Sequence, residues 1–297
     1  MPIRKSDSKP NFAVLLATYN GVFWIEKQLR SIIIQTKVSV TVFVSDDMSN
    51  DGTFEQISSL TKDFNNIKIL PRIKHGTPAL NFHYLLKSCD FSNFDYIAFA
   101  DQDDIWNCNK LHHAIRTIEQ DNLSGYSSDV IAFWDDGRDK LLKKSFPQKK
   151  FDYFFEAAGP GCTYVLKQQP AQKFKKFLIK NWEYVNLVEL HDWMIYAYFR
   201  SQGMKWKIDD KPLMRYRQHD HNQVGLNSGL KAYLIRFNKI KIKWYRNEVQ
   251  KIIYLLDGSS EQNISLKILF LIKNFWNLRR RPRDAIFLLF MIIFQIF

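Results

Sequence analysis

The chain has 297 residues, of which 46% are hydrophobic and 15% aromatic, and it carries a formal net charge of +13. This length and composition exclude an intrinsically disordered chain and leave room for one large domain or two ordinary ones. The polar N-terminus lacks the apolar core of a secretory signal. The cysteines lack the spacing of zinc ligands, so we expect reduced thiols in a cytosolic protein at Cys89, Cys108 and Cys162.

The N-terminal part of the chain alternates between short apolar runs and stretches in which apolar residues recur with helical spacing. Strands that alternate with helices through short connections are typical of a parallel sheet. We therefore predict an α/β fold with a mostly parallel sheet covered by helices on both faces. The predicted strands are residues 12–18, 40–44, 67–70 and 96–100, and the predicted helices are residues 24–36, 51–64, 77–88 and 109–119.

After residue 125 the alternation loosens. A helix is predicted at residues 187–202, and the Gly-Pro-Gly sequence at residues 159–161 reads as a turn that enters a strand ending near residue 166. Further short strands are predicted at residues 130–134, 204–208 and 213–216. These changes divide the chain into residues 1–125, 126–229 and 230–297.

Acidic residues follow two of the predicted strands at the point where each strand ends. One strand leads directly into Asp101, Asp103 and Asp104, and another leads into Asp46 and Asp47. Clustered carboxylates at the end of a buried strand repel one another unless a cation neutralises them, and Mg²⁺ or Mn²⁺ prefers oxygen ligands. Two strands that deliver acids to their carboxyl ends predict a ligand crevice in an open α/β sheet. The alternative is that each cluster is a solvated acidic turn.

Several short motifs occur in a fixed order along the chain. They are Ala-Thr-Tyr-Asn-Gly at residues 17–21, Ser-Asp-Asp-x-Ser-x-Asp-Gly-Thr at residues 45–53 and Asp-Gln-Asp-Asp-Ile-Trp at residues 101–106. This order resembles the family 2 glycosyltransferases. His-Asp-Trp at residues 191–193 and Tyr-Arg-Gln-His-x-x-Asn-Gln-Val-Gly at residues 216–225 resemble the bacterial rhamnosyltransferase-like branch of that family.

The resemblance spans about residues 12–225 and implies a GT-A fold. Residues 1–125 then form the half that binds a nucleotide-diphosphate sugar, and residues 126–229 form the half that shapes the acceptor site. Tyr19 matches the residue whose ring packs on the nucleotide base, Asp47 the acid that accepts from the pyrimidine N–H, and Asp101 an acid near the ribose. The residues that the resemblance places at the donor are Thr18, Tyr19, Asp47, Asp101, Gln102, Arg217 and His219.

The resemblance also implies a site for a divalent cation, Mg²⁺ or Mn²⁺. Asp103 of the Asp-x-Asp motif matches the metal ligand, and His219 is a second candidate. His219 lies near Arg215, Arg217 and His221 in the sequence, a set suited to contact with a diphosphate or a metal. The alternative is a surface turn rich in polar residues, and the role of His221 is left open.

Asp192 matches the general base of the family. A carboxylate within one hydrogen bond of an acceptor hydroxyl can take its proton as that hydroxyl attacks the anomeric carbon. Attack from the face opposite the leaving group inverts that centre, so no protein nucleophile is required. By itself, an acid in this position is also an ordinary N-terminal charge favoured by the helix dipole.

These matches imply an inverting, metal-dependent glycosyltransferase of bacterial surface polysaccharide assembly, such as capsule or O-antigen. It would move a sugar, rhamnose or a related hexose, from a dTDP- or UDP-linked donor to a glycan acceptor linked to polyprenyl diphosphate. One alternative is a nucleotidyltransferase that makes sugar nucleotides, although the loop at residues 17–21 lacks the basic residue expected there. The other is a basic nucleic-acid- or membrane-binding protein without catalysis, which leaves the acid clusters unexplained.

The positive charge is concentrated in the C-terminal quarter, where residues 230–283 contain thirteen basic and three acidic residues interleaved with aromatic ones. This composition fits a helical region on an anionic membrane, and nucleic acid binding is the alternative.

Residues 285–297 contain one polar residue, but a helix of this length spans about 20 Å, short of the ~30 Å hydrocarbon core. We therefore predict a protein without a nucleic acid partner that is cytoplasmic and peripheral on the inner face of the cell membrane. The alternative is that this helix packs back on the protein core. The predicted headgroup anchors are Arg279, Arg280, Arg281 and Arg283.

Overall fold

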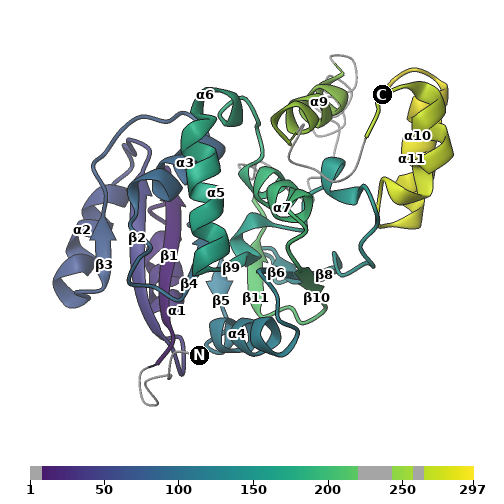
Figure 1. The fold of residues 1–297 in the computed structure, drawn as a ribbon. Coiled ribbons are helices and arrows are strands. Elements are labelled where there is room, and N and C mark those ends of the chain that lie inside the picture. Colours follow the sequence, from purple (N-terminus) through teal and green to yellow (C-terminus); the bar gives the residue numbers. More distant parts are fainter. Residues whose placement is uncertain (1–8, 220–242, 257–263) are drawn as a thin grey trace.

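The computed structural model describes residues 9–219, 243–256 and 264–297. A sheet of seven strands runs through its centre, and the strands lie in the order β10-β6-β9-β4-β1-β2-β3 (Figure 1). Neighbouring strands are parallel, except that β9 runs antiparallel to both β4 and β6. The strands are β1 (Asn11–Thr18), β2 (Ser39–Asp46), β3 (Ile67–Ile69), β4 (Tyr96–Ala100), β6 (Gly125–Ser128), β9 (Val165–Lys167) and β10 (Trp206–Asp209).

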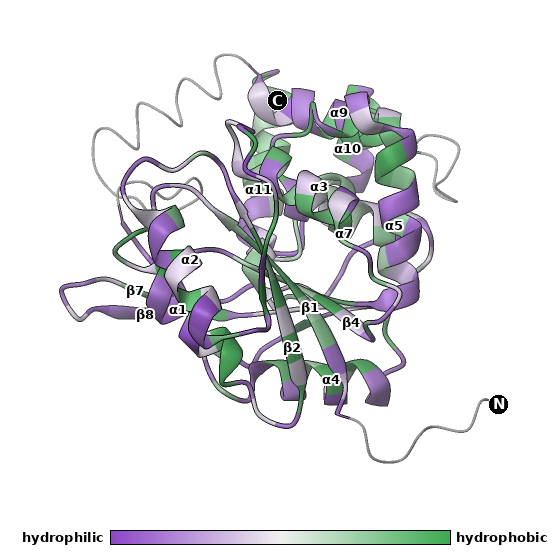
Figure 2. Cartoon of the chain, turned by 90° about the vertical axis from the view of Figure 1, so that its left-hand side faces the viewer, coloured by the Kyte–Doolittle hydropathy of each residue, from purple (hydrophilic) through white to green (hydrophobic). Residues whose placement is uncertain are grey.

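The central strand β1 explains why helices cover both faces of the sheet. Its apolar side chains alternate, so that Ala13 and Leu15 join one hydrophobic core while Val14 and Leu16 join the other. In Figure 2 the sheet lies between α1 and α2 on one side and α3 and α5 on the other. The predicted mostly parallel, doubly covered sheet is confirmed. One core is closed by α3 (Pro78–Ser88), α5 (Gln168–Lys180) and α7 (His191–Ser201), and the other by α1 (Ile25–Ile33), α2 (Thr53–Asp63) and α4 (Lys110–Gln120).

A second, smaller sheet returns the chain to the acidic loop that follows β4. Its strand β11 pairs antiparallel with β5, which comes directly after the acids. This pairing places Arg217 against Asp104, although 113 positions separate the two residues in the sequence. The strands lie in the order β5 (Ile105–Trp106), β11 (Met214–Arg217), β7 (Val130–Phe133) and β8 (Asp139–Leu142).

Most of the predicted elements are present, with ends that differ by a few residues. The helix predicted from residue 187 begins at His191, because the residues before it form the short helix α6 (Trp182–Val185) and a turn. The sequence pattern does not predict α5, β5, β6 or β8. In α5 only Ala171, Phe174 and Leu178 are buried, and lysines and glutamines surround them in the sequence. The helical recurrence of apolar residues is therefore weak in this segment.

The described residues after 242 form a helical C-terminal extension, which packs one face against the rest of the molecule. Val249, Ile252 and Leu288 join the same core as α7. Among the described residues, no helix combines the length and the apolar character needed to cross a bilayer. The extension contains α9 (Trp244–Leu256), α10 (Ile268–Asn274), the 3₁₀ turn η3 (Phe275–Asn277) and α11 (Pro282–Ile293).

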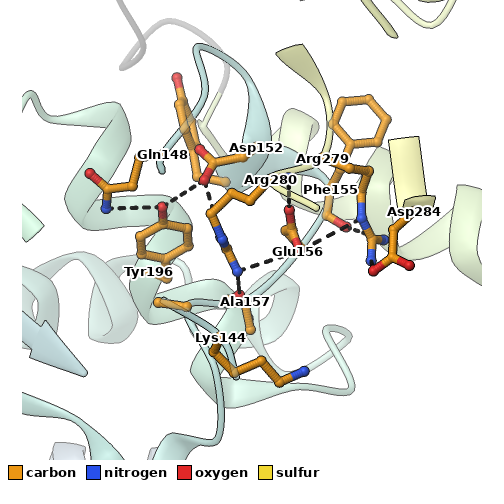
Figure 3. A network of polar contacts seen from close by, with 12 residues as sticks. Lys144, Gln148, Asp152, Phe155, Glu156, Ala157, Tyr196, Arg279, Arg280 and Asp284 are labelled. Carbon is orange, nitrogen blue, oxygen red and sulfur yellow. Dashed lines mark hydrogen bonds and ion pairs between the residues drawn. The ribbon is translucent and has the colours of Figure 1, made fainter. Parts of the chain in front are cut away.

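A buried ion-pair network fastens this extension to the core (Figure 3). The side chain of Asp152 is fully buried, and its carboxylate lies 3.1 Å from Nη1 of Arg280 and 3.3 Å from Nη1 of Arg200. Arg280 also donates to the carbonyl of Ala157 and pairs with Glu156 at 3.4 Å. The guanidinium of Arg280 therefore bridges the loop at residues 152–157 and the start of α11.

The prediction that Arg279 and Arg280 anchor lipid headgroups is wrong. Arg280 is buried in the network just described, and Arg279 lies 3.7 Å from Glu156 and 3.8 Å from Asp284. Of the four arginines predicted as anchors, Arg281 and Arg283 are exposed. The sequence could not separate them, because Glu156, which pairs with both of the first two, and Asp152, which pairs with Arg280, lie more than a hundred positions upstream.

We predict that Arg280→Met destabilises the protein by about 3 kcal/mol, because it leaves the buried carboxylate of Asp152 with one cation in place of two. Urea unfolding midpoints measured at constant pH would check this. The matched control is Arg281→Met, which removes an exposed guanidinium and is expected to change the stability by less than about 0.5 kcal/mol. Equal midpoints for the two variants would show that the network does not hold the extension.

Candidate active site

The carboxyl ends of β1, β2 and β4 meet at one edge of the main sheet. In the strand register Thr18 lies opposite Asp46, and Leu16 lies opposite Ala100. The acids after β2 and those after β4 therefore flank the end of β1, as the sequence predicts. The amide of Asp47 donates to the carbonyl of Thr18 at 2.9 Å and closes this edge on one side.

The loop after β1 is held by the side-chain amide of Gln102. Its oxygen accepts from the Thr18 hydroxyl at 2.6 Å and from the Tyr19 amide at 2.8 Å, and its nitrogen donates to the Tyr19 carbonyl at 2.9 Å. A Cβ on Gly21 would lie 2.3 Å from the Gln102 oxygen, so any other residue here would displace the Gln102 amide. The ring of Tyr19 is 55% exposed beside the crevice.

The two acids after β2 are both bound by neighbouring groups. Asp46 accepts from Nε of Arg72 at 2.8 Å and from the hydroxyl of Ser49. Asp47 accepts from the backbone amides of His75 and Gly76, the latter at 2.8 Å. Its carboxylate thus orders the loop between β3 and α3 next to the crevice.

Asp101, which is half-buried, and the buried Asp104 form an acidic pair beside the thiol of Cys162. Oxygen and sulfur atoms of the three residues lie within 4.8 Å of one another. Burial, together with the nearby charges of Asp103 and Asp192, raises the pKa of Asp101 to about 7. Burial also raises the pKa of Asp104, and among the described residues its Oδ2 has no hydrogen-bond partner. The pair thus lacks the full compensating positive charge that two carboxylates need, and a cation at this edge would supply it.

All three cysteines are free thiols, as predicted. No sequence pattern predicts, however, that Cys162 lies beside the acids, because β9 and the turn before it reach them only through the fold. Burial raises the pKa of the Cys162 thiol, so it stays protonated and is a poor ligand for a hard ion.

Asp103 and His219 meet at the mouth of the crevice. Oδ2 of Asp103 lies 2.7 Å from Nε2 of His219, and the ring of Trp24 stacks on the imidazole with centroids 4.4 Å apart. Arg217 lies behind them, where its Nε donates to the Asp103 carbonyl at 3.0 Å and its Nη1 pairs with Asp135. The second sheet thus brings Arg217 and His219 of the Arg-Gln-His motif to the acidic loop.

The other basic residues of that motif are placed differently. Arg215 pairs with Asp139 on the small sheet, 2.6 Å between nitrogen and oxygen, and its side chain is half exposed. His221 and the Asn-Gln-Val-Gly sequence at residues 222–225 lie outside the described residues.

Asp192 lies in the first turn of α7, where the Trp193 amide donates to its carboxylate at 2.7 Å. Burial raises the pKa of Asp192 to about 6, while that amide, the Lys144 ammonium and the Gly161 amide favour the charged form. A Cβ on Gly161 would lie 3.1 Å from the Asp192 Cβ, so the loop before β9 passes directly against this acid. Because its charge also affects Asp101, the structure brings Asp192 to the same crevice.

Two lysines near the acids were missed by the sequence analysis. Lys144 follows β8 and is one of five lysines in residues 140–150, and no sequence motif distinguishes it from the others. Lys110 is buried, with its ammonium 3.3 Å from the Cys162 carbonyl and 3.6 Å from the centre of the Trp106 ring. Burial lowers the pKa of Lys110 to about 7. It lies directly behind the acidic pair, where its charge partly offsets that of Asp104.

Comparison with known proteins gives a consistent result. The model of the family "Glycosyl transferase family 2" matches residues 13–187. The chain is 45% identical over 289 residues to the dTDP-rhamnosyl transferase RfbG of Shigella flexneri, covering 95% of this chain and 100% of that protein. It is 28% identical over 158 residues to the UDP-Glc:alpha-D-GlcNAc-diphosphoundecaprenol beta-1,3-glucosyltransferase WfgD of Escherichia coli, covering 52% of this chain and 58% of that protein.

A solved structure shows the same fold. The mannosyltransferase PcManGT from Pyrobaculum calidifontis, in complex with GDP-Man and Mn²⁺, superposes with a TM-score of 0.53 and 15% sequence identity. The superposition covers 84% of this chain and 71% of that chain. At this identity the likeness concerns the fold alone.

We predict that Gly21→Ala destabilises the protein by about 1–2 kcal/mol, because the added methyl displaces the Gln102 amide from Thr18 and Tyr19. In a Gln102→Ala background the same change is expected to cost less than about 0.5 kcal/mol, since the clash is gone. Denaturant unfolding of the four proteins in this double-mutant cycle measures the coupling. Equal costs in the two backgrounds would contradict the contact.

Proposed function

The chain belongs to glycosyl transferase family 2, and we propose that it transfers rhamnose from dTDP-rhamnose to a glycan acceptor. It is an enzyme with the GT-A fold. The donor is proposed from the 45% identity to a dTDP-rhamnosyl transferase over the whole of that protein. The observation that carries the reaction class is the meeting of the acids after β2 and β4 at one edge of the sheet. Nothing in the comparisons supports a nucleotidyltransferase or a non-catalytic binding protein.

We assign the donor to the crevice at the ends of β1, β2 and β4, within residues 1–125. We assign the exposed ring of Tyr19 to packing on the thymine base, and Asp47, whose carboxylate also accepts from the Gly76 amide, to accepting from the pyrimidine N–H. Asp101 is assigned to the ribose. Thr18 and Gln102 are assigned a positioning role. The Gln102 side chain binds the Thr18 hydroxyl and the backbone of Tyr19, and so holds the loop that carries the Tyr19 ring.

The residues at the mouth of the crevice fit a divalent cation, Mg²⁺ or Mn²⁺. Asp103 and His219 supply an oxygen and a nitrogen ligand 2.7 Å apart, and the same acidic loop holds Oδ2 of Asp104, which accepts no hydrogen bond from the part of the chain that the structure describes. When bound, such an ion stabilises the negative charge that grows on the leaving diphosphate. Arg217 holds the backbone of this loop through the Asp103 carbonyl, so we give it a positioning role in place of direct contact with the donor.

We assign the proton transfer to Asp192, within the acceptor half at residues 126–229. Its carboxylate removes the proton of the acceptor hydroxyl as the oxygen forms a bond to the anomeric carbon. The bond between that carbon and the diphosphate oxygen breaks on the opposite face, so the configuration inverts. With a pKa of about 6, Asp192 is charged and able to accept a proton at neutral pH.

The acceptor is proposed to be a glycan on polyprenyl diphosphate, met at the inner face of the cell membrane during surface polysaccharide assembly. Support comes from the relative WfgD, whose name specifies a diphosphoundecaprenol acceptor. The basic, partly apolar C-terminal extension at residues 230–297 is consistent with an enzyme that is cytoplasmic and peripheral on the membrane.

We predict that dTDP-rhamnose with Mn²⁺ raises the melting temperature more than UDP-glucose or GDP-mannose does, because bound ligand stabilises the folded state. Asp103→Asn is expected to remove the part of this shift that depends on Mn²⁺, and Asp136→Asn, an exposed acid, is the control. Release of dTDP in the presence of acceptor lipid measures transfer directly. A larger shift with another sugar nucleotide would reassign the donor.

We predict that kcat/KM falls about tenfold per pH unit below pH 6, because only the carboxylate form of Asp192 accepts a proton. Lys144→Met removes the nearby ammonium and raises the pKa of Asp192, so the fall in kcat/KM begins at a higher pH. Lys144→Arg keeps the positive charge and leaves the pH dependence unchanged. Lys140→Met, on the same segment, is the control for lost charge. Asp192→Asn should lower turnover by about 10²-fold or more; near-normal turnover in that variant would assign the base elsewhere.

A further inference from the structure

The outer surface of α10, η3 and α11 is apolar and exposed. In α11 the exposed apolar side chains recur at intervals of one, three and four residues, which places them on one side of the helix. Residues 268–276 repeat this spacing. We call these nine side chains the apolar face: Ile268, Leu269, Ile272, Trp276, Ile286, Phe287, Phe290, Ile293 and Phe294.

This face is fixed outward by the packing of the opposite side. Leu288, Met291 and Ile292 of α11 are buried in the core, together with Leu271 of α10. α10 and α11 contact each other, and Figure 1 shows them side by side at the edge of the molecule. The ion pairs of Arg280 hold the start of α11 in place. The apolar face is therefore a permanent surface, and turning it inward would break a buried network.

The charges around the apolar face are positive. Residues 264–297 contain six basic residues and one acid, Asp284, which lies 3.8 Å from Arg279 and 3.3 Å from Arg283. The exposed cations are Lys267, Lys273, Arg281 and Arg283. A symmetric contact between two copies would bring these like charges together, whereas an anionic surface would neutralise them.

A hollow opens beside the same face, between the start of α9 and α11. Its volume is about 530 Å³, and most of its wall is apolar, including Trp244, Phe287, Met291 and Phe297. Phe287 belongs both to this wall and to the apolar face. Apolar surface exposed on this scale in one region marks a site of association.

We propose that the C-terminal extension is a preformed docking surface for an anionic phospholipid bilayer. The apolar face enters the region between headgroups and acyl chains, and the exposed cations bind lipid phosphates. The inference deepens the proposed function, since an acceptor carried on polyprenyl diphosphate lies at that surface. The Arg280 network then fixes the acceptor half of the enzyme relative to the membrane.

The test compares vesicles of phosphatidylcholine with vesicles that also contain phosphatidylglycerol, using the full chain. The unaltered protein should co-sediment with the anionic vesicles and not with the neutral ones. Phe290→Asp with Phe294→Asp should weaken this binding at least about tenfold, because two aromatic side chains no longer enter the bilayer. The matched control, Ile34→Asp with Ile179→Asp, changes two exposed apolar residues outside the extension and should bind as the unaltered protein does.

Arg281→Gln with Arg283→Gln should weaken binding several-fold and reduce its dependence on salt. Leu269→Asp, at a side chain that is 83% exposed, serves as a second variant if the phenylalanine pair lowers the unfolding midpoint. Unchanged vesicle binding by the phenylalanine and leucine variants would overturn the proposal. A dimer of the unaltered protein that these changes split, without vesicle binding, would assign the face to a second copy.

Transfer to a water-soluble, short-chain acceptor separates this inference from the proposed function. The double variant Phe290→Asp with Phe294→Asp should transfer to this acceptor at the unaltered rate, because the changed residues lie outside the crevice. Absence of transfer by the unaltered protein, with anionic vesicle binding intact, would contradict the proposed function alone.

Discussion

The crowding of carboxylates at one edge of the main sheet is the electrostatic constraint on which the site depends. Five acids lie at or just after the ends of β2 and β4, and their negative charges are compensated to different degrees. Arg72 neutralises Asp46, and two backbone amides bind Asp47. His219 lies against Asp103. Asp101 and Asp104 keep raised pKa values because burial leaves them without a full counter-charge. This residual deficit of positive charge is what makes the crevice suitable for a cation and the diphosphate it would bind.

The smaller sheet completes this arrangement of charges. Strand β11 pairs with β5, the short strand directly after the acids, and its end carries Arg217 and His219 back to the acidic loop. Arg217 binds the loop from behind through the Asp103 carbonyl, and Trp24 covers the His219 ring from α1's N-terminal side. A mutation in β11 would therefore alter the acidic loop without touching any acid. The same logic applies to Gly161, whose lack of a side chain lets the loop before β9 pass against Asp192.

The C-terminal extension is coupled to this half of the molecule by charge as well as by packing. Arg280, just before α11, binds Asp152, Glu156 and Ala157. The loop that follows Ala157 leads to Gly161, which lies against Asp192. Lys144 lies between the two regions, since its charge affects Asp192 and is itself affected by Glu156 and Arg280. Lys144 is thus an electrostatic neighbour of both the proposed base and the arginines that hold the extension.

The sequence by itself determined the type of fold and the identity of the acids. Strand and helix periods are set by local burial, so the alternation up to residue 125 and the acids that end β2 and β4 could be predicted without coordinates. The tertiary structure alone decided which residues meet across the chain: Cys162 and Lys110 beside the acids, Lys144 near Asp192, and Arg280 with Asp152. Arg279 and Arg280 look like Arg281 in the sequence, yet Arg280 is buried and Arg279 half-buried in ion pairs, whereas Arg281 is exposed. Glu156, which pairs with Arg279 and Arg280, and Asp152, which pairs with Arg280, lie more than a hundred positions away. Such contacts depend on how the strands and helices pack, and no local sequence pattern predicts them.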